Sequence, residues 1–137
     1  MKIQSLQDYR EFIKKNKSLM TSGQIILLSG EVGAGKTEFV KALVEVLHQK
    51  KTVQSPTFSL HHHYDGDPAI EHWDLYRLEN EDDLESAGFW DQFSDSSSLI
   101  IVEWPERLKK EWIPAAWKQT HFEIIKVDDT EREIKQL

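Results

Sequence analysis

The sequence predicts a three-layer α/β domain with parallel central strands and antiparallel hairpin additions. Two continuous apolar runs, residues 24–29 and 99–102, have the composition of strands buried on both faces of a sheet. The first run leads into a glycine-rich turn and then a helical pattern, which is the order of a P-loop NTPase-like unit. Later segments broken by acidic turns are typical of antiparallel hairpins.

The first half of the chain is predicted to run helix, strand, helix and hairpin. Ser5 is a helix N-cap, with Asp8 in a position resembling a capping box, and an apolar stripe continues this helix to about residue 20. The strand over residues 24–29 follows, and residues 38–49 form the next helix. The turn sequence Asp65-Gly66 then separates two extended segments, which predicts a hairpin.

The second half is predicted to place short helices around one more buried strand. Residues 79–87 form an acidic helix that Gly88 ends, and residues 89–93 add another helical turn. The remaining elements are a strand over residues 99–102, a short helix over residues 106–112, and a hairpin of residues 120–127 and 131–136. We see no repeat, so residues 1–137 are predicted to form a single domain.

The composition excludes several classes of protein. The chain has no cysteine, so it has no disulfide, thiolate metal site or cysteine nucleophile. Its formal charge of −7 argues against a protein that binds nucleic acid by itself, because such proteins carry a basic face. The N-terminus lacks the apolar core of a signal peptide, and no apolar run approaches the ~20 residues of a membrane span. We expect a soluble, cytoplasmic protein.

The glycine-rich turn has the spacing G-x-x-x-x-G-K-T of a phosphate-binding loop. Glycines let backbone N–H groups point inward around a phosphate, and the following helix adds about half a positive charge at the same point. Lys36 would reach the β- and γ-phosphates, and the Thr37 hydroxyl would bind Mg²⁺. The residues predicted to bind the nucleotide are Gly30, Glu31, Val32, Gly33, Ala34, Gly35, Lys36 and Thr37, with Glu38 directly after them.

Two carboxylates are candidates for the acid that positions the metal ion or the attacking water. A P-loop site needs such an acid at the end of a second buried strand, and Glu103 directly follows residues 99–102. Asp74 is the second candidate, because an alternating strand would put it on one face with His72 and Tyr76, a costly set to bury without a function. We therefore expect Asp74 and Glu103 to be catalytic and, with Thr37, to form the metal site.

Thr57 is a weaker catalytic candidate. It lies in Ser55-Pro56-Thr57-Phe58, after the predicted helix of the phosphate loop. In nucleotide switches a hydroxyl from this region completes the shell around Mg²⁺ and the γ-phosphate. Ser-Pro-Thr is also a common way to begin a strand, so both interpretations stay open.

Taken together, these motifs resemble the TsaE (YjeE-like) family of small bacterial P-loop ATPases. The resemblance covers nearly the whole chain, and its first motif, residues 30–37, is shared by many P-loop proteins. The motifs specific to the family in this order and spacing are Ser55-Pro56-Thr57-Phe58, His72-Trp73-Asp74-Leu75-Tyr76-Arg77 and Val102-Glu103-Trp104-Pro105.

The resemblance implies a role in making the threonylcarbamoyladenosine modification of tRNA. Family members bind ATP and Mg²⁺, hydrolyse ATP slowly, and act with TsaD and TsaB, of which TsaD carries the transferase chemistry. Carried over by position, Lys36 and Thr37 would bind nucleotide and metal, and Glu103 would lie in the Mg²⁺ shell. Asp74 would be a catalytic or metal-site acid, and Arg132 would contribute to the nucleotide pocket. The acidic charge implies that another subunit holds the tRNA.

Glu38 departs from the pattern of the family. The family usually has Thr or Ser here, with a hydroxyl that touches the α-phosphate, whereas a carboxylate suits the helix dipole but repels a phosphate. We expect Glu38 to turn away and leave the backbone N–H groups to bind the α-phosphate.

Three other functions are alternatives to an ATPase. A small-molecule kinase usually has an arginine-bearing lid, and none of the four arginines falls in a lid-like insertion. A GTP-dependent switch would need N-K-x-D, and the nearest match, residues 125–128, lacks the Asn. A nucleotide-binding scaffold without turnover stays open.

Overall fold

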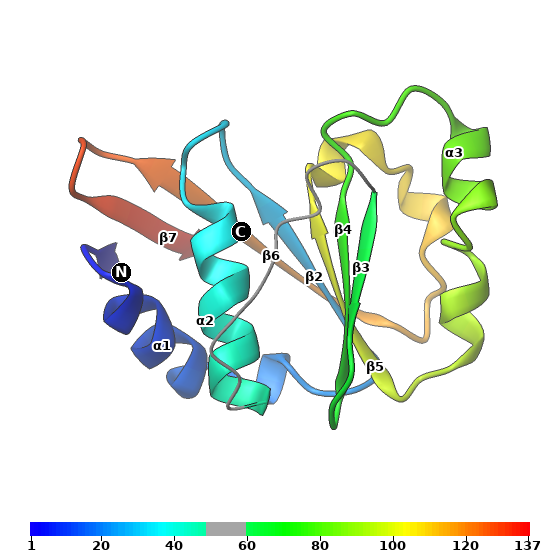
Figure 1. Ribbon diagram of the computed structural model, residues 1–137, viewed down its shortest axis with the longest axis horizontal. Helices are drawn as coiled ribbons and strands as arrows, with labels where there is room; N and C mark the ends of the chain where they lie inside the picture. Colours follow the sequence, from blue (N-terminus) through cyan, green and yellow to red (C-terminus); the bar gives the residue numbers. More distant parts are fainter. Residues whose placement is uncertain (49–59) are drawn as a thin grey trace.

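The computed structural model describes residues 1–48 and 60–137, in which the strands form one mixed sheet between two layers of helices (Figure 1). In the described residues the strand order is β1-β7-β6-β2-β5-β4-β3. The strands are β1 (Lys2–Ile3), β2 (Gln24–Ser29), β3 (His61–Tyr64), β4 (Ala69–Asp74), β5 (Ser98–Glu103), β6 (Lys118–Lys126) and β7 (Arg132–Gln136). The α-helices are α1 (Leu6–Lys15), α2 (Lys36–His48) and α3 (Glu81–Ser86).

The centre of the sheet is parallel and its edges are antiparallel. β6, β2, β5 and β4 run in the same direction, whereas β3 pairs antiparallel with β4, β7 with β6, and β1 with β7. Every residue of β5 is buried, as expected for a strand covered on both faces. The predicted fold class and both predicted hairpins are therefore confirmed for the described residues.

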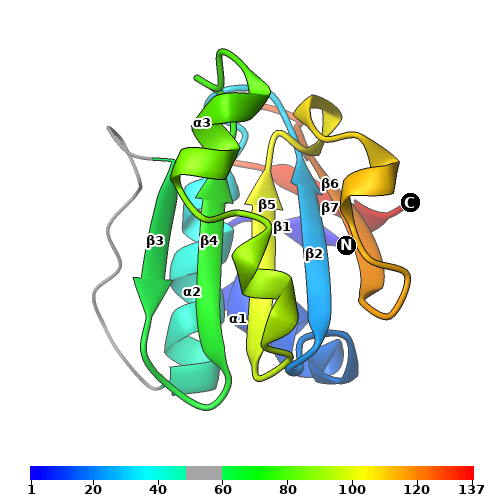
Figure 2. The same ribbon diagram turned by 90° about the vertical axis from the view of Figure 1, so that its right-hand side faces the viewer.

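Each face of the sheet has its own core. Figure 2 shows α3 in front of the sheet, with α1 and α2 behind it. On the side of α1 and α2, the rings of Phe12, Phe39 and Phe122 pack edge-to-face or tilted against one another. On the other side, Trp73 packs edge-to-face on Phe89. A buried side chain of this size contributes about 1.5–3 kcal/mol, so large aromatic rings offset the shortness of the helices on that side.

The helix starts follow the capping residues. Ser5 Oγ accepts the backbone N–H of Asp8 at 3.3 Å, while the Asp8 carboxylate accepts the N–H of Gln4 at 2.8 Å. Asn80 and Asp83 form a complete capping box at the start of α3. The first helix therefore begins where the sequence predicts, whereas α3 begins at Glu81, two residues later than predicted, because Asn80 is its N-cap.

The predicted helix over residues 106–112 is wrong. The chain there forms two short 3₁₀ turns, Pro105–Arg107 and Lys110–Trp112, separated by extended backbone at Leu108 and Lys109. The extended φ and ψ of Leu108 and Lys109 interrupt the helical backbone, so no α-helix can continue across them. The first helix is also shorter than predicted, because α1 ends at Lys15 and a 3₁₀ turn, Lys17–Leu19, follows.

Thr57 lies outside the described residues, so the structure gives no position for it. Among residues 1–48 and 60–137, no helix combines the length and the apolar composition needed to cross a membrane.

Candidate nucleotide-binding site

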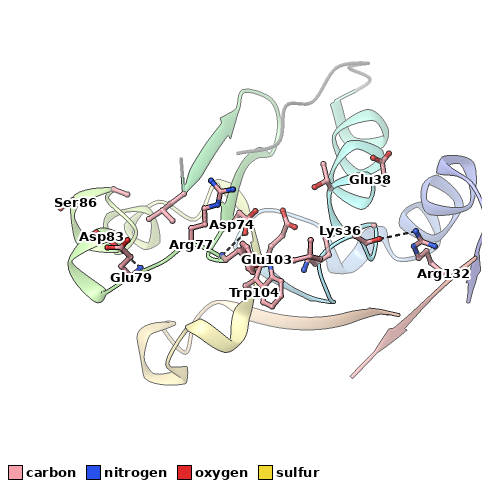
Figure 3. Close-up of a pocket in the computed structure, with 17 residues that line it drawn as sticks. Lys36, Glu38, Asp74, Arg77, Glu79, Asp83, Ser86, Glu103, Trp104 and Arg132 are labelled. Carbon is pink, nitrogen blue, oxygen red and sulfur yellow. Dashed lines mark hydrogen bonds between the residues drawn. The ribbon is translucent and has the colours of Figure 1, made fainter. Parts of the chain in front are cut away.

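The carboxyl-terminal ends of β2, β5 and β4 meet at a cavity of about 1020 Å³ (Figure 3). Ligands of open α/β sheets bind at this edge of the parallel strands. One wall is the glycine-rich loop, and the other is the connection from β4 to α3. The residues that line the cavity are Val32, Gly33, Gly35, Lys36, Thr37, Glu38, Leu60, Asp74, Tyr76, Arg77, Glu79, Asp83, Ser86, Ala87, Glu103, Trp104 and Arg132.

The backbone of the loop requires glycine at Gly35. Its φ of +105° lies in the region that side chains rarely adopt, and a Cβ there would stand 2.8 Å from the Tyr9 hydroxyl oxygen. α2 begins at the next residue, so the loop leads directly into a helix N-terminus. Such an N-terminus attracts anions, which fits a loop that binds phosphate.

Lys36 is held at the floor of the cavity. Its side chain is only 6% exposed, and its Nζ donates a hydrogen bond to the carbonyl of Gly30. The same Nζ lies 3.9 Å from the ring centroid of Trp104. Burial lowers the pKa of Lys36, and the carboxylates of Glu103 and Asp74 oppose that shift. The site therefore presents a desolvated cation, which attracts a phosphate more strongly than a solvated one would.

Glu103 and Asp74 are neighbours because β4 and β5 pair in parallel with Asp74 opposite Glu103. Glu103 is buried and accepts a hydrogen bond from His72 Nε2 at 2.6 Å. Burial and the charge of Glu103 raise the pKa of Asp74, and a 3.1 Å hydrogen bond from the Tyr76 N–H partly offsets that rise. Two acids thus share one end of the sheet in different environments: Glu103 is held by His72, and Asp74 by the following turn.

Trp104 contacts Lys36 in the cavity, and the sequence pattern did not predict this contact. It has a left-handed backbone, with φ of 61°, and it turns the chain directly after β5. Its ring lies under Lys36 and 4.9 Å from the ring of Tyr76. Left-handed non-glycine residues are uncommon and occur often at functional sites. The strained turn therefore places the indole where it contacts the cation.

Arg132 approaches the phosphate loop from β7. Its Nε donates to the carbonyl of Ala34 at 3.0 Å, and its Nη1 donates to the carbonyl of Asp128 at 2.7 Å. A third bond, from Nη2 to the carbonyl of Gly33 at 3.4 Å, joins two residues that line the cavity (Figure 3). The guanidinium thus ties the closing hairpin to the loop. Beside it, Tyr9 is buried, and burial raises the pKa of Tyr9 to about 12.

The predicted site residues fall into three groups. Val32, Gly33, Gly35, Lys36, Thr37, Glu38, Asp74, Glu103 and Arg132 line one cavity. Three further predicted residues belong to the phosphate-binding loop but do not line the cavity: Gly30, Glu31 and Ala34. Thr57 lies outside the described residues. Sequence reasoning did not assign Arg77, Glu79, Asp83 and Ser86, which line the side of the cavity nearest α3. Arg77 belongs to the motif of residues 72–77, but that motif did not indicate a place in the cavity for it. The connection from β4 to α3 brings all four residues to the cavity.

The oxygen donors around the cavity suit a hard cation. Thr37 offers a hydroxyl, and Asp74 and Glu103 offer carboxylates. In the part of the chain that the structure describes, no three His, Asp or Glu side chains are arranged to hold a metal by themselves. Mg²⁺ needs no such set, since it usually takes one or two carboxylates together with waters and phosphate oxygens. The residues present therefore fit Mg²⁺ bound with a nucleotide.

Glu38 lies on the cavity wall, but its carboxylate is engaged elsewhere. It pairs with Lys41 Nζ at 3.4 Å, and about half of its side chain is exposed to solvent. This arrangement fits the expectation that Glu38 turns away from the phosphate loop.

Glu38→Thr is expected to tighten ATP binding by a few-fold. The substitution removes the repulsion between a carboxylate and the phosphates, which is about 1 kcal/mol for two charges roughly 4 Å apart in water. It also adds a hydroxyl that can donate a hydrogen bond. Titration of a fluorescent ATP analogue measures the effect. Glu11→Thr, at an exposed position of α1, makes the same charge change as a control. Weaker binding in Glu38→Thr than in the wild type would show that the repulsion argument is wrong.

Comparison with known proteins identifies a single family. The family model described as threonylcarbamoyl adenosine biosynthesis protein TsaE matches residues 3–134. A relative from Bacillus subtilis (strain 168), called tRNA threonylcarbamoyladenosine biosynthesis protein TsaE, is 33% identical over 129 residues, which are 93% of this chain and 78% of the relative. A protein of the same name from Aquifex aeolicus is 36% identical over 110 residues, covering 78% of this chain and 77% of the relative.

Other matches are partial or structural. A protein of that name from Nostoc sp. is 37% identical over 92 residues, and this match spans 65% of the chain and only 57% of the relative. The crystal structure of Bacillus subtilis YdiB superposes with a TM-score of 0.71 at 26% sequence identity, covering 99% of this chain and 82% of that one. The structural match therefore spans the segments of the chain that carry the glycine-rich loop, Asp74, Glu103 and the closing hairpin.

Proposed function

The chain belongs to the TsaE family of threonylcarbamoyl adenosine biosynthesis proteins, and on this premise we propose that it is a Mg²⁺-dependent ATPase of that pathway. The observation that carries the proposal is the convergence of Lys36, Asp74 and Glu103 on one cavity beside a phosphate-binding loop. A loop alone indicates only nucleotide binding. Two acids at the adjoining strand ends add the groups that hydrolysis needs.

Each side chain has a separate role in this proposal. Lys36 exchanges its hydrogen bond to Gly30 for the β- and γ-phosphates, and Thr37 and Glu103 hold the metal. Mg²⁺, when bound, neutralises charge that develops on the phosphate oxygens. Asp74 orients the attacking water, because its raised pKa favours it as a proton acceptor.

We also propose that the protein acts with TsaD and TsaB, and that it meets tRNA only through them. The formal charge of −7 disfavours direct contact with an RNA backbone, so another subunit would have to hold the tRNA. ATP hydrolysis would then serve to reset the transferase complex between turnovers. The chain would be a weak ATPase alone and a faster one within the complex.

The test is phosphate release from ATP by the protein alone and with its TsaD and TsaB partners. We expect slow release alone, stimulation by the partners, and partner capture in a pull-down that depends on ATP. Trp104 fluorescence should respond to nucleotide, because its ring contacts Lys36. Transfer of phosphate to a metabolite would favour a kinase instead, and binding without turnover under all conditions would favour a scaffold.

A further inference from the structure

His72 is a fully buried polar side chain inside a sheet. It lies in β4, two residues before Asp74, and its exposed fraction is 0%. It is on the same side of the strand as Ile70, the side that packs against α1 and α2. Burying an imidazole among apolar side chains costs free energy unless its polar atoms are hydrogen-bonded. Some interaction must therefore offset that cost.

The compensating interaction of His72 goes to Glu103. The two side chains are 0% and 3% exposed, and the atoms Nε2 and Oε2 are 2.6 Å apart. A carboxylate only accepts hydrogen bonds, so Nε2 carries the hydrogen and donates it. The other ring nitrogen, Nδ1, is buried and has no hydrogen-bond partner among the described residues. Within the described residues, Glu103 is thus the one group to which the His72 ring donates.

The bond fixes one oxygen of Glu103 and leaves the other for the cavity. Glu103 ends β5 and lines the cavity beside Lys36 and Trp104, so its carboxylate has the core on one side and the site on the other. A carboxylate tied at one oxygen keeps a single orientation of the second. Groups that hold a metal ligand from behind in this way typically change metal affinity or activity by about 10- to 100-fold when they are removed.

We propose that His72 is a positioning residue, which orients Glu103 so that its free oxygen faces the metal ion of the nucleotide complex. The inference rests on the proposed function, because it assumes that Glu103 binds the metal. His72 itself would touch neither the metal nor the nucleotide. Its contribution would be to the geometry of Glu103, in addition to the packing of β4.

The test measures metal binding directly, with Mn²⁺ as a spectroscopic probe for Mg²⁺. Electron paramagnetic resonance gives the affinity of Mn²⁺ for the complex of the protein with ADP. We expect His72→Leu to weaken that affinity about 10-fold. His72→Gln, whose amide nitrogen can reach the place of Nε2, should retain most of the affinity. His72→Asn, whose amide reaches only the place of Nδ1, should lose as much as His72→Leu.

His48 provides a matched control. Its Nε2 bonds a backbone carbonyl, that of Pro68, at 2.6 Å, and its Nδ1 is also buried without a partner among the described residues. It ends α2, which begins at Lys36, so it lies about 18 Å along the helix from the site. His48→Leu should leave Mn²⁺ affinity unchanged, although it removes a comparable hydrogen bond.

Three outcomes would contradict the proposal. Wild-type Mn²⁺ affinity in folded His72→Leu overturns the inference and leaves the ATPase proposal intact. Equal losses in His72→Gln and His72→Asn, with thermal unfolding unchanged, also overturn it, because the donor at Nε2 would then not matter. This second comparison decides the question if His72→Leu does not fold. A wild-type nucleotide complex that binds no Mn²⁺ overturns the proposed metal site and the inference with it.

Discussion

Lys36→Met is expected to abolish nucleotide binding at ordinary concentrations while leaving the fold intact. Losing one partner of a desolvated charge pair costs about 2–5 kcal/mol, which corresponds to roughly 30-fold to several thousand-fold in affinity. Lys36 is such a partner, because it is 6% exposed and lies beside the loop that would hold the phosphates. Titration with a fluorescent ATP analogue measures the loss. Lys14→Met, at an exposed position of α1, is the control for a change of charge alone.

The same substitution is expected to leave thermal stability equal or higher. Burial lowers the pKa of Lys36, so the protein without nucleotide holds this charge at a cost in folding free energy at neutral pH. Methionine keeps an aliphatic chain against Trp104 and removes that cost. Loss of binding together with an unchanged or raised melting temperature would separate function from folding. Undiminished ATP binding by Lys36→Met would mean that this lysine does not hold the phosphates.

The sequence was sufficient to predict the parts of the fold that depend on local pattern. The apolar runs that became β2 and β5 are buried on both faces, and this character is visible without knowing their neighbours. The order of strand, glycine-rich loop and helix predicts that Lys36 and Thr37 directly precede the helix, and α2 begins with these two residues. Glu103 is predicted to lie at the site because it ends a buried strand, and the ends of parallel strands converge at one edge; in the structure it lines the cavity.

The contacts that organise the site could not be predicted in this way, because they depend on strand register and backbone turns. The hydrogen bond between His72 and Glu103 joins residues 31 positions apart, and it exists only because β4 and β5 pair in one particular alignment. The contact of Trp104 with Lys36 depends on the left-handed backbone conformation of Trp104, which a tryptophan side chain does not favour. The sequence also predicts that His72, Asp74 and Tyr76 share one face of a strand. Only His72 and Asp74 do so, because β4 ends at Asp74 and the chain turns before Tyr76.

Glu103→Gln is expected to separate binding from turnover. Glutamine keeps an oxygen that can accept the hydrogen bond from His72, so the core around β5 should stay packed. The negative charge is lost, and with it the strong ligand for Mg²⁺, so ATP hydrolysis with the partner proteins should fall on the order of 10²-fold. Binding of ATP without metal should be unchanged or tighter, because one negative charge beside the phosphates has gone.

The two effects should be measured on the same preparation, by phosphate release and by titration in the presence of a metal chelator. Glu106→Gln removes an exposed carboxylate three residues further along and controls for charge in the neighbourhood of Lys36. If Glu103→Gln turned over ATP at the wild-type rate, Glu103 would have no part in the mechanism. Asp74 would then be the remaining acid at the strand ends, and the single substitution Asp74→Asn should be enough to stop hydrolysis. Loss of metal-free binding in Glu103→Gln would instead indicate that Glu103 shapes the phosphate loop, because a missing metal ligand does not affect binding in chelator.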